Sequence, residues 1–144
     1  MLIKELITEI KGFIPSHLLV DTQIDEQLLE ELHHQFQDRG YQFEEYHSTL
    51  IAIGLLSLYI YCHRQINDGM NHDHLSTFIL KGDYFYGLYY QYCSNEAFHF
   101  IHLGFAQQLK KAEIISLAAS GYPSLIQEVL NLFEEEVTQH ELLV

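Results

Sequence analysis

The sequence predicts an all-α protein, with about six helices packed as one bundle in a single domain over residues 1–144. Apolar residues recur at three- and four-residue spacing along most of the chain, and no segment alternates apolar and polar residues as a half-buried strand does. Only two prolines and eight glycines interrupt the 144 residues. A chain of this length buries about 70% of the surface that its unfolded form exposes, so one hydrophobic core is expected.

The first predicted helix covers residues 1–13. Its apolar stripe is Leu2, Leu6, Ile10 and Phe13. Pro15 disfavours helical geometry at the residue before it, so the helix is expected to end there.

The second predicted helix begins just after Thr22 and stops near Arg39 and Gly40. Thr22 and Asp25 resemble a capping box, and the apolar stripe that follows is Ile24, Leu28, Leu32 and Phe36. Asp21 and Asp25 are also conceivable as a pair of metal ligands. Capping is the preferred interpretation, because acids at a helix start satisfy free N–H groups and stabilise the helix dipole.

The longest continuous helix candidate, Phe43–Ile66, is apolar on more than one face and is expected at the centre of the bundle. Gly54 in its interior costs about 1 kcal/mol relative to alanine, so we expect a neighbouring helix to approach closely there. A turn over residues 67–71 follows, and Asp73 is expected to cap the next helix.

The next helix is predicted over Ser76–Cys93 and is apolar or aromatic almost all round. One face carries Phe78, Ile79, Gly82, Tyr86, Tyr89 and Cys93, and another carries Leu80, Tyr84, Leu88 and Tyr92. A helix of this kind belongs at the centre of a bundle or in an interface between subunits. The five tyrosines from Tyr84 to Tyr92 favour an interface at least as strongly as a core, because aromatic residues with polar tips are enriched at interfaces.

Two more helices are predicted after Ser94. The stripe of the first is Phe98, Ile101, Phe105, Leu109, Ala112, Ile115 and Ala119, and Gly121 is expected to end it. Pro123 suits the first position of the last helix, whose buried face is predicted to be Ile126, Val129, Leu130, Phe133 and Val137.

Composition narrows the function. The formal net charge is −13, from 20 acidic and 7 basic residues, so a nucleic-acid partner is not expected. The longest apolar run, Leu50–Cys62, is shorter than the roughly 20 residues that span a bilayer, and charged residues interrupt the N-terminal apolar segment. We therefore expect a cytoplasmic protein without stable membrane insertion. Cys62 and Cys93 lack CxxC spacing and favour buried free thiols.

Motifs for chemistry are few. The chain has no G-x-S-x-G elbow and no glycine-rich phosphate loop. His47, followed by the run His72–His74, is loosely similar to the H…HD…D order of helical metal phosphohydrolases, and His99 and His102 lie three residues apart. Such a site needs a further acid on a later helix, and none after Asp83 is a clear candidate. Metal chemistry is therefore the minor alternative.

The stretch Phe78–Tyr90, F-I-L-K-G-D-Y-F-Y-G-L-Y-Y, resembles the Gly-Asp helix of trans-prenyl diphosphate synthases. The resemblance is closest to the small subunit of two-component bacterial hexaprenyl and heptaprenyl diphosphate synthases, and it is strongest over Leu50–Ser94. Within this stretch, Gly82 and Asp83 correspond to the Gly-Asp motif of the family. The resemblance implies a fold like half of a trans-prenyl diphosphate synthase, with Asp83 as a structural acid.

In catalytic members of that superfamily, the helix before Gly-Asp ends in DDxxD, whose carboxylates hold magnesium on the allylic diphosphate. Here the corresponding helix end reads R-Q-I-N-D over residues 64–68, and the chain contains no Asp-Asp pair. The single Asp68 does not supply the several oxygen ligands that a magnesium–diphosphate site needs. The second Asp-rich motif is also missing. The resemblance therefore implies a chain that is inactive alone and binds no cofactor, with Mg²⁺ in a catalytic partner.

The resemblance also implies what that complex does. A larger catalytic subunit with the DDxxD motifs pairs with this chain, and the heterodimer is a prenyltransferase that extends farnesyl diphosphate with isopentenyl diphosphate for menaquinone side chains. The short chain favours the hexaprenyl type over the heptaprenyl type. This subunit would complete the partner's fold and wall the tunnel around the prenyl tail, so that bulky side chains set product length sterically.

Eight residues are candidates for the interface or the tunnel end. They are Leu55, Leu58 and Tyr59 on the third helix, and Tyr84, Phe85, Tyr86, Leu88 and Tyr89 on the fourth. Periodicity does not separate core from partner-facing residues on helices that are apolar all round. A helical adaptor with another partner, a self-associating structural bundle and a metal phosphohydrolase stay open as alternatives.

Overall fold

The computed structural model describes residues 2–94 and 123–143, and in the second range it describes side chains from residue 126 to residue 138. The described residues form five α-helices and one short 3-10 helix, and they contain no strand. The all-α prediction is confirmed for these residues. The helix predicted after Ser94, with Gly121 at its end, lies outside them.

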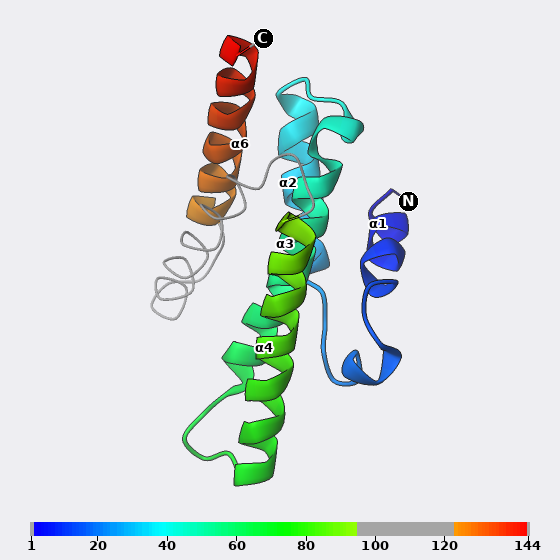
Figure 1. The fold of residues 1–144 in the computed structure, drawn as a ribbon, viewed down its shortest axis with the longest axis vertical. Helices are drawn as coiled ribbons and strands as arrows, with labels where there is room; N and C mark the ends of the chain where they lie inside the picture. The colour runs from blue at the N-terminus through cyan, green and yellow to red at the C-terminus, as the bar shows by residue number, and fades with distance from the viewer. Residues whose placement is uncertain (1, 95–122, 144) are drawn as a thin grey trace.

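The central element is α3 (Phe43–Gln65), which contacts α1, α2 and α4. Every residue from Thr49 to Leu58 is buried, so the helix is enclosed on all sides over nearly three turns. Figure 1 shows α4 running alongside α3, with α1 and α2 at its other sides. The predicted central position of this helix is confirmed.

The first helix, α1 (Leu2–Lys11), lies on α3 through a stripe that differs from the predicted one. Its buried residues are Ile3, Leu6, Ile7 and Ile10. The predicted stripe was right for Leu6 and Ile10 and wrong for Phe13, which is 44% exposed. The helix ends at Lys11, so the helical spacing does not extend to Phe13.

Gly54 marks the point where α1 approaches α3. A Cβ atom built on Gly54 would overlap Ile10 Cδ1 of α1 and would lie 3.7 Å from Leu29 Cδ1 of α2. Two neighbouring helices therefore use the space that a side chain at position 54 would fill. The close approach predicted for this glycine is confirmed.

The N-terminal end of α2 (Glu26–Asp38) is capped by Asp25, whose side chain accepts a hydrogen bond from Leu28 N at 3.1 Å. The preference for capping over metal binding at Asp25 is thus supported by a direct contact. The capping box with Thr22 was wrong. The 3-10 helix η1 (Ser16–Leu18) precedes Thr22, and the Thr22 hydroxyl donates to Leu18 O at 3.2 Å instead.

The cap of α4 (His72–Ser94) is Asn71 rather than the predicted Asp73. Asn71 Oδ1 accepts a hydrogen bond from His74 N at 2.9 Å, and Asp73 lies inside the first turn. The predicted turn over residues 67–71 is present, and Asn67 organises it by accepting from Gly69 N at 3.0 Å. Asparagine fits both positions because its side-chain oxygen accepts from a backbone N–H two or three residues ahead.

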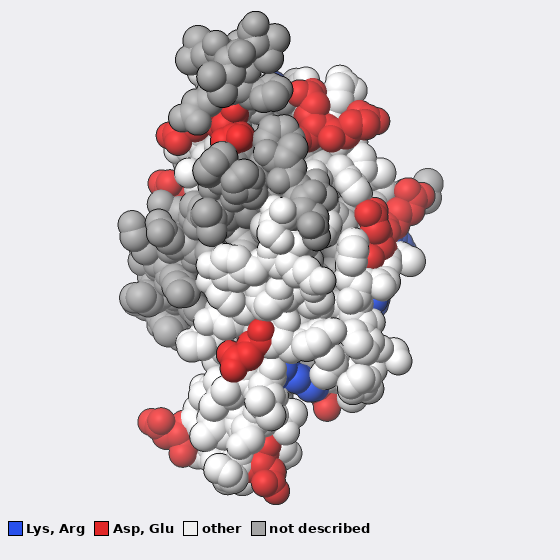
Figure 2. Space-filling view, in the orientation of Figure 1, with Lys and Arg blue, Asp and Glu red and all other residues white. Residues whose placement is uncertain are grey.

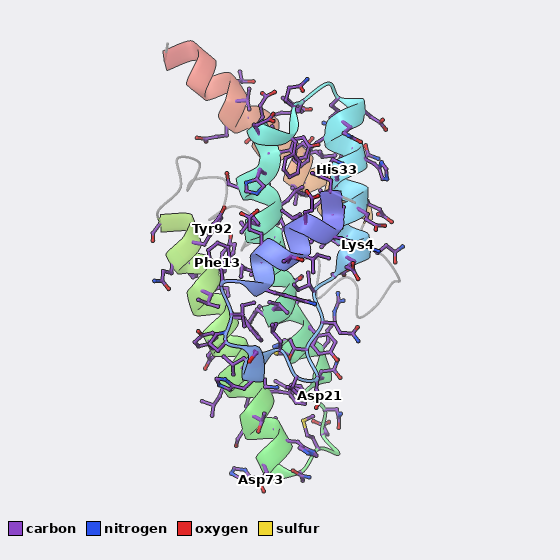
Figure 3. The ribbon with its side chains drawn as sticks, turned by 90° about the vertical axis from the view of Figure 1, so that its right-hand side faces the viewer. Lys4, Phe13, Asp21, His33, Asp73 and Tyr92 are labelled. Carbon is purple, nitrogen blue, oxygen red and sulfur yellow. The ribbon has the colours of Figure 1, made fainter. Side chains whose placement is uncertain are left out.

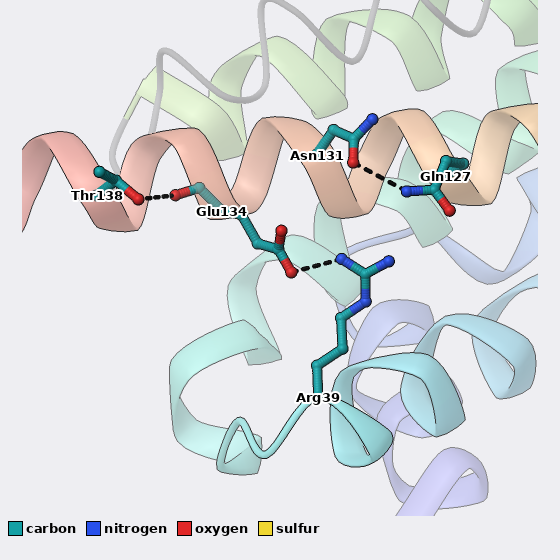
Figure 4. Close-up of polar contacts among 5 residues, drawn as sticks. All are labelled: Arg39, Gln127, Asn131, Glu134 and Thr138. Atoms are coloured by element: carbon teal, nitrogen blue, oxygen red, sulfur yellow. Dashed lines mark hydrogen bonds and ion pairs between the residues drawn. The ribbon is translucent and has the colours of Figure 1, made fainter.

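The last described helix, α6 (Pro123–Leu143), begins at Pro123 as predicted and packs on α2. Its buried residues are Ile126, Val129, Leu130 and Phe133, and Val137 is partly buried. The Phe133 ring lies 4.8 Å from that of Phe36 and 5.0 Å from that of Tyr41. Figure 4 shows the ion pair between Arg39, just after α2, and Glu134 of α6.

Candidate functional site

Helix α4 buries one narrow stripe and leaves the rest of its circumference half-buried or exposed. Its buried residues are Gly82, Phe85, Tyr89 and Cys93. They recur at three- and four-residue intervals, so they lie on one face, and that face packs against α3. Of the two helices that are apolar all round, α3 is therefore a core helix, whereas α4 lies at the edge of the described bundle.

Gly82 of α4 packs directly against α3. A Cβ atom built there would lie 3.5 Å from Cys62 Cβ and 3.7 Å from Tyr59 Cδ1, which is ordinary van der Waals contact. Cys62 and Cys93 are buried free cysteines, as predicted. Burial raises the pKa of the Cys62 thiol to about 11, only partly offset by Lys81. The thiol stays protonated at neutral pH and packs as a small apolar residue.

A cluster of tyrosines lines one side of the contact between α3 and α4. The Tyr86 ring lies 4.9 Å from that of Tyr59 and 4.8 Å from that of Tyr90, and Tyr86 Oη donates to Tyr90 Oη at 3.2 Å. Burial raises the pKa of Tyr86 and of Tyr89. Neighbouring tyrosine hydroxyls raise the pKa of Tyr86 further, and the Cys93 thiol and neighbouring tyrosine hydroxyls raise that of Tyr89 further. These phenols stay protonated, so the cluster contributes packing and hydrogen bonds and no general base at neutral pH.

The outward side of α4 exposes large apolar side chains. Leu80 is 69% exposed and Tyr84 is 40% exposed, and the two lie one turn apart on the same face. Ile79 and Tyr90 are also exposed beside them. Figure 2 shows a largely uncharged surface over this helix, with scattered acidic side chains and some lysine or arginine atoms among the uncharged residues. Contiguous exposed apolar side chains are typical of interaction surfaces.

A groove of about 610 Å³ lies between the end of α1, the first half of α3 and the second half of α4. Its lining residues are Glu9, Phe13, His47, Ser48, Leu55, Leu88, Gln91 and Tyr92. Figure 3 shows Phe13 and Tyr92 side by side at its edge, and their rings meet edge to face with centroids 5.6 Å apart. The volume falls within the range of about 300–1,000 Å³ that is usual for small-molecule sites.

The groove has an apolar part and a polar part. Phe13, Leu55, Leu88 and Tyr92 supply the apolar walls. At the other side, His47 Nε2 and Glu9 Oε1 are hydrogen-bonded at 2.9 Å, and this contact joins α1 to α3. The described lining residues include no lysine or arginine, so the groove suits an apolar chain better than a diphosphate group.

The structure separates the eight candidate residues into four environments. Leu58 and Phe85 are fully buried in the core. Tyr59, Tyr86 and Tyr89 belong to the tyrosine cluster. Leu55 and Leu88 line the groove. Tyr84 lies on the exposed side of α4. The eight residues therefore do not form one site.

The described residues with metal-ligand character do not gather at one place, and His47 lines the groove beside Glu9. Asp68 and Asp83 are exposed, the first in the turn after α3 and the second on α4. Within the described ranges, no three His, Cys, Asp or Glu residues are placed to hold a metal ion. The proposed His99 and His102 pair lies outside those ranges.

Sequence reasoning missed the groove residues Phe13, His47 and Tyr92 as a set. Phe13 lies just after α1, His47 lies on α3 and Tyr92 lies on α4, so the three are far apart along the chain and no local pattern links them. Within residues 2–94 and 123–143, no helix is both long enough and apolar enough to cross a membrane.

No protein family model, curated protein or solved structure matches this chain.

Proposed function

We propose that this chain is a non-catalytic subunit that determines product length in a heteromeric long-chain polyprenyl diphosphate synthase of the hexaprenyl type. The observation that carries the proposal is the exposed apolar side of α4, where Leu80 and Tyr84 lie uncovered by the described residues. This side belongs to the stretch that resembles the Gly-Asp helix of prenyl synthases. Its partner in the proposal is the larger catalytic subunit that carries the Asp-rich motifs and binds Mg²⁺.

Energetics support contact with a partner at this side. Fully burying one leucine or aromatic side chain contributes about 1.5–3 kcal/mol relative to leaving it exposed. Covering Leu80, Tyr84 and Tyr90 together therefore offers a complex several kcal/mol that the isolated chain does not realise. Asp83 lies on the same side of α4 as an exposed acid, where a partner can reach it.

The groove supports the second half of the proposal, the control of product length. It contains two of the eight candidate residues, Leu55 and Leu88, and its apolar walls suit a hydrocarbon tail. In the proposed complex, the tail that grows in the partner's active site extends into or toward this groove. The side chains that line it then limit how many isoprene units fit.

Copurification and activity assays test the proposal. We expect this chain alone to incorporate no labelled isopentenyl diphosphate, and the complex with a cognate catalytic subunit to produce long all-trans prenyl diphosphates from farnesyl diphosphate. Replacing both Leu80 and Tyr84 by aspartate should abolish the complex. Gln35→Asp, on the exposed side of α2, is the matched control and should leave the complex intact.

Two results would contradict the proposal. Substantial incorporation by this chain alone would show that it is itself a catalyst. Failure to bind any catalytic prenyl synthase subunit would favour a helical adaptor for another partner, which would use the same exposed side of α4.

A further inference from the structure

The two longest helices, α3 and α4, contain three interior glycines: Gly54, Gly82 and Gly87. Glycine in a helix interior is destabilising relative to alanine, so each position needs a compensating reason. Two have one in the described structure. Gly54 lies where α1 and α2 approach α3, and Gly82 lies where α3 and α4 touch.

Gly87 differs from the other two. No atom of the described residues lies within 4 Å of a Cβ atom built on Gly87. It follows Leu80 by seven residues and Tyr84 by three, so it shares their exposed side of α4. The result is a flat stretch of backbone flanked by exposed apolar side chains.

The charges on this side of α4 have one sign. Asp83 lies one turn before Gly87, and Asp73 shares the face of Tyr84. Lys81 is the one lysine or arginine in α4, and its Nζ donates to Val20 O at 2.9 Å, which directs it toward the segment before α2. A second copy of this chain would set Asp83 against another acidic surface on a protein of net charge −13.

We infer that a helix of the partner crosses α4 at Gly87, packs apolar side chains on Leu80 and Tyr84, and presents lysine or arginine to Asp83. The absence of a side chain at position 87 lets the two helix backbones approach closely, as Gly54 does for α1 within this chain. This inference rests on the proposed function and adds the chemistry of the contacting element: an amphipathic, basic helix.

Binding of the purified catalytic subunit to wild type and variants tests the crossing point. Gly87→Leu should weaken binding about tenfold or more, because the new side chain occupies the space of the crossing helix. In the free chain none of the described residues would clash with the same leucine, so the melting temperature should stay the same or rise. Gln27→Leu adds a leucine to the exposed side of α2 and should leave binding unchanged.

A charge reversal tests the basic character of the partner helix. Asp83→Lys should weaken binding about tenfold and reduce its dependence on salt, because it places like charges opposite each other. Asp38→Lys makes the same change at the exposed end of α2 and should have little effect.

The outcomes separate this inference from the proposed function. If wild type binds the catalytic subunit and Gly87→Leu binds equally well, the crossing at Gly87 is wrong and the proposed function stands. If Asp83→Lys binds as well as Asp38→Lys does, the partner helix is not basic. A stable wild-type homodimer that Gly87→Leu dissociates would make a second copy the occupant. Absence of any wild-type binding would overturn both proposals.

Discussion

Gly54 lies on a buried face of α3, whereas Gly87 lies on the exposed side of α4. We expect Gly54→Leu to lower the free energy of unfolding by about 1–3 kcal/mol, because its side chain would overlap Ile10 and press on Leu29. Gly87→Leu is the matched control and should cost nothing, or gain up to about 1 kcal/mol from helix propensity. Urea unfolding of the two variants measures both. Equal losses would contradict the close approach of α1 to α3.

His33 and Tyr46 form a buried polar pair between α2 and α3. Tyr46 Oη and His33 Nδ1 are hydrogen-bonded at 2.8 Å, and the Tyr46 ring stacks on Phe36 with centroids 4.5 Å apart. Burial lowers the pKa of His33, and the charges of His34 and the N-terminus lower it further. The folded state therefore favours the neutral imidazole.

This lowered pKa predicts a loss of stability in acid. The pKa of histidine in the unfolded chain is about 6.5, so between that value and the lower folded value the unfolded state binds more protons. The His33 contribution to stability is fully present above pH 6.5 and is lost as pH falls through the folded pKa. We expect His33→Gln to remove this part of the pH dependence of unfolding.

The control for His33 is His17→Gln, because His17 is exposed in η1. Thermal or urea unfolding between about pH 4 and pH 8 compares each variant with wild type, which removes the contribution of the other titrating groups. Retention of the full wild-type dependence in His33→Gln, or its loss in His17→Gln, would show that another group is responsible.

At the scale of elements, α6 is held on α2 by aromatic packing more than by its ion pair. Phe133 is fully buried against Phe36 and Tyr41, and Phe133→Ala should cost about 3–5 kcal/mol. Arg39 and Glu134 are partly exposed, so Arg39→Ala should cost at most about 1 kcal/mol. Denaturant unfolding ranks the two. A larger loss in Arg39→Ala would show that charge, and not packing, positions α6.

Local sequence signals predicted some helix ends and missed others. Gly40 and Pro123 lie at the helix ends where they were expected. Asp25 caps α2 itself and is not the third residue of a box that begins at Thr22. The cap of α4 was wrong because Asn71 and Asp73 are both good caps. Only the register of the preceding turn, set by Asn67, selects Asn71.

The exposed side of α4 and the groove are formed by contacts between helices, and the periodicity of the sequence does not predict those contacts. The α4 sequence is apolar on every face, so which stripe is buried depends on how the helix is rotated against α3. The groove needs Phe13, two residues after α1, to meet Tyr92 near the end of α4, across almost the whole described N-terminal range. Burial of the middle of α3 was predicted from its apolar residues on every face. The same signal in α4 did not make that helix central, because only one of its faces packs against α3.

At the scale of the whole molecule, α4 connects three environments. Phe85 and Tyr89 join it to the core through α3, Leu88 and Tyr92 face the groove, and Tyr84 lies on the exposed side. A partner docked on the exposed side would therefore contact the same helix that lines the groove. In the proposed complex, the same helix would therefore bind the partner and limit the length of the prenyl tail.

The groove predicts opposite changes in product length for smaller and larger side chains. In the complex with the catalytic subunit, we expect Leu88→Ala and Tyr92→Ala to shift the products toward longer chains, because each removes apolar volume from a groove wall. Leu88→Trp should shift them toward shorter chains. Chromatography of the dephosphorylated products measures the distribution of chain lengths.

The control is Phe85→Leu, which changes a buried core residue outside the groove. It should lower stability while leaving product length unchanged. Identical products from all three groove variants, with binding intact, would mean that the tail does not reach this groove and that another surface sets its length.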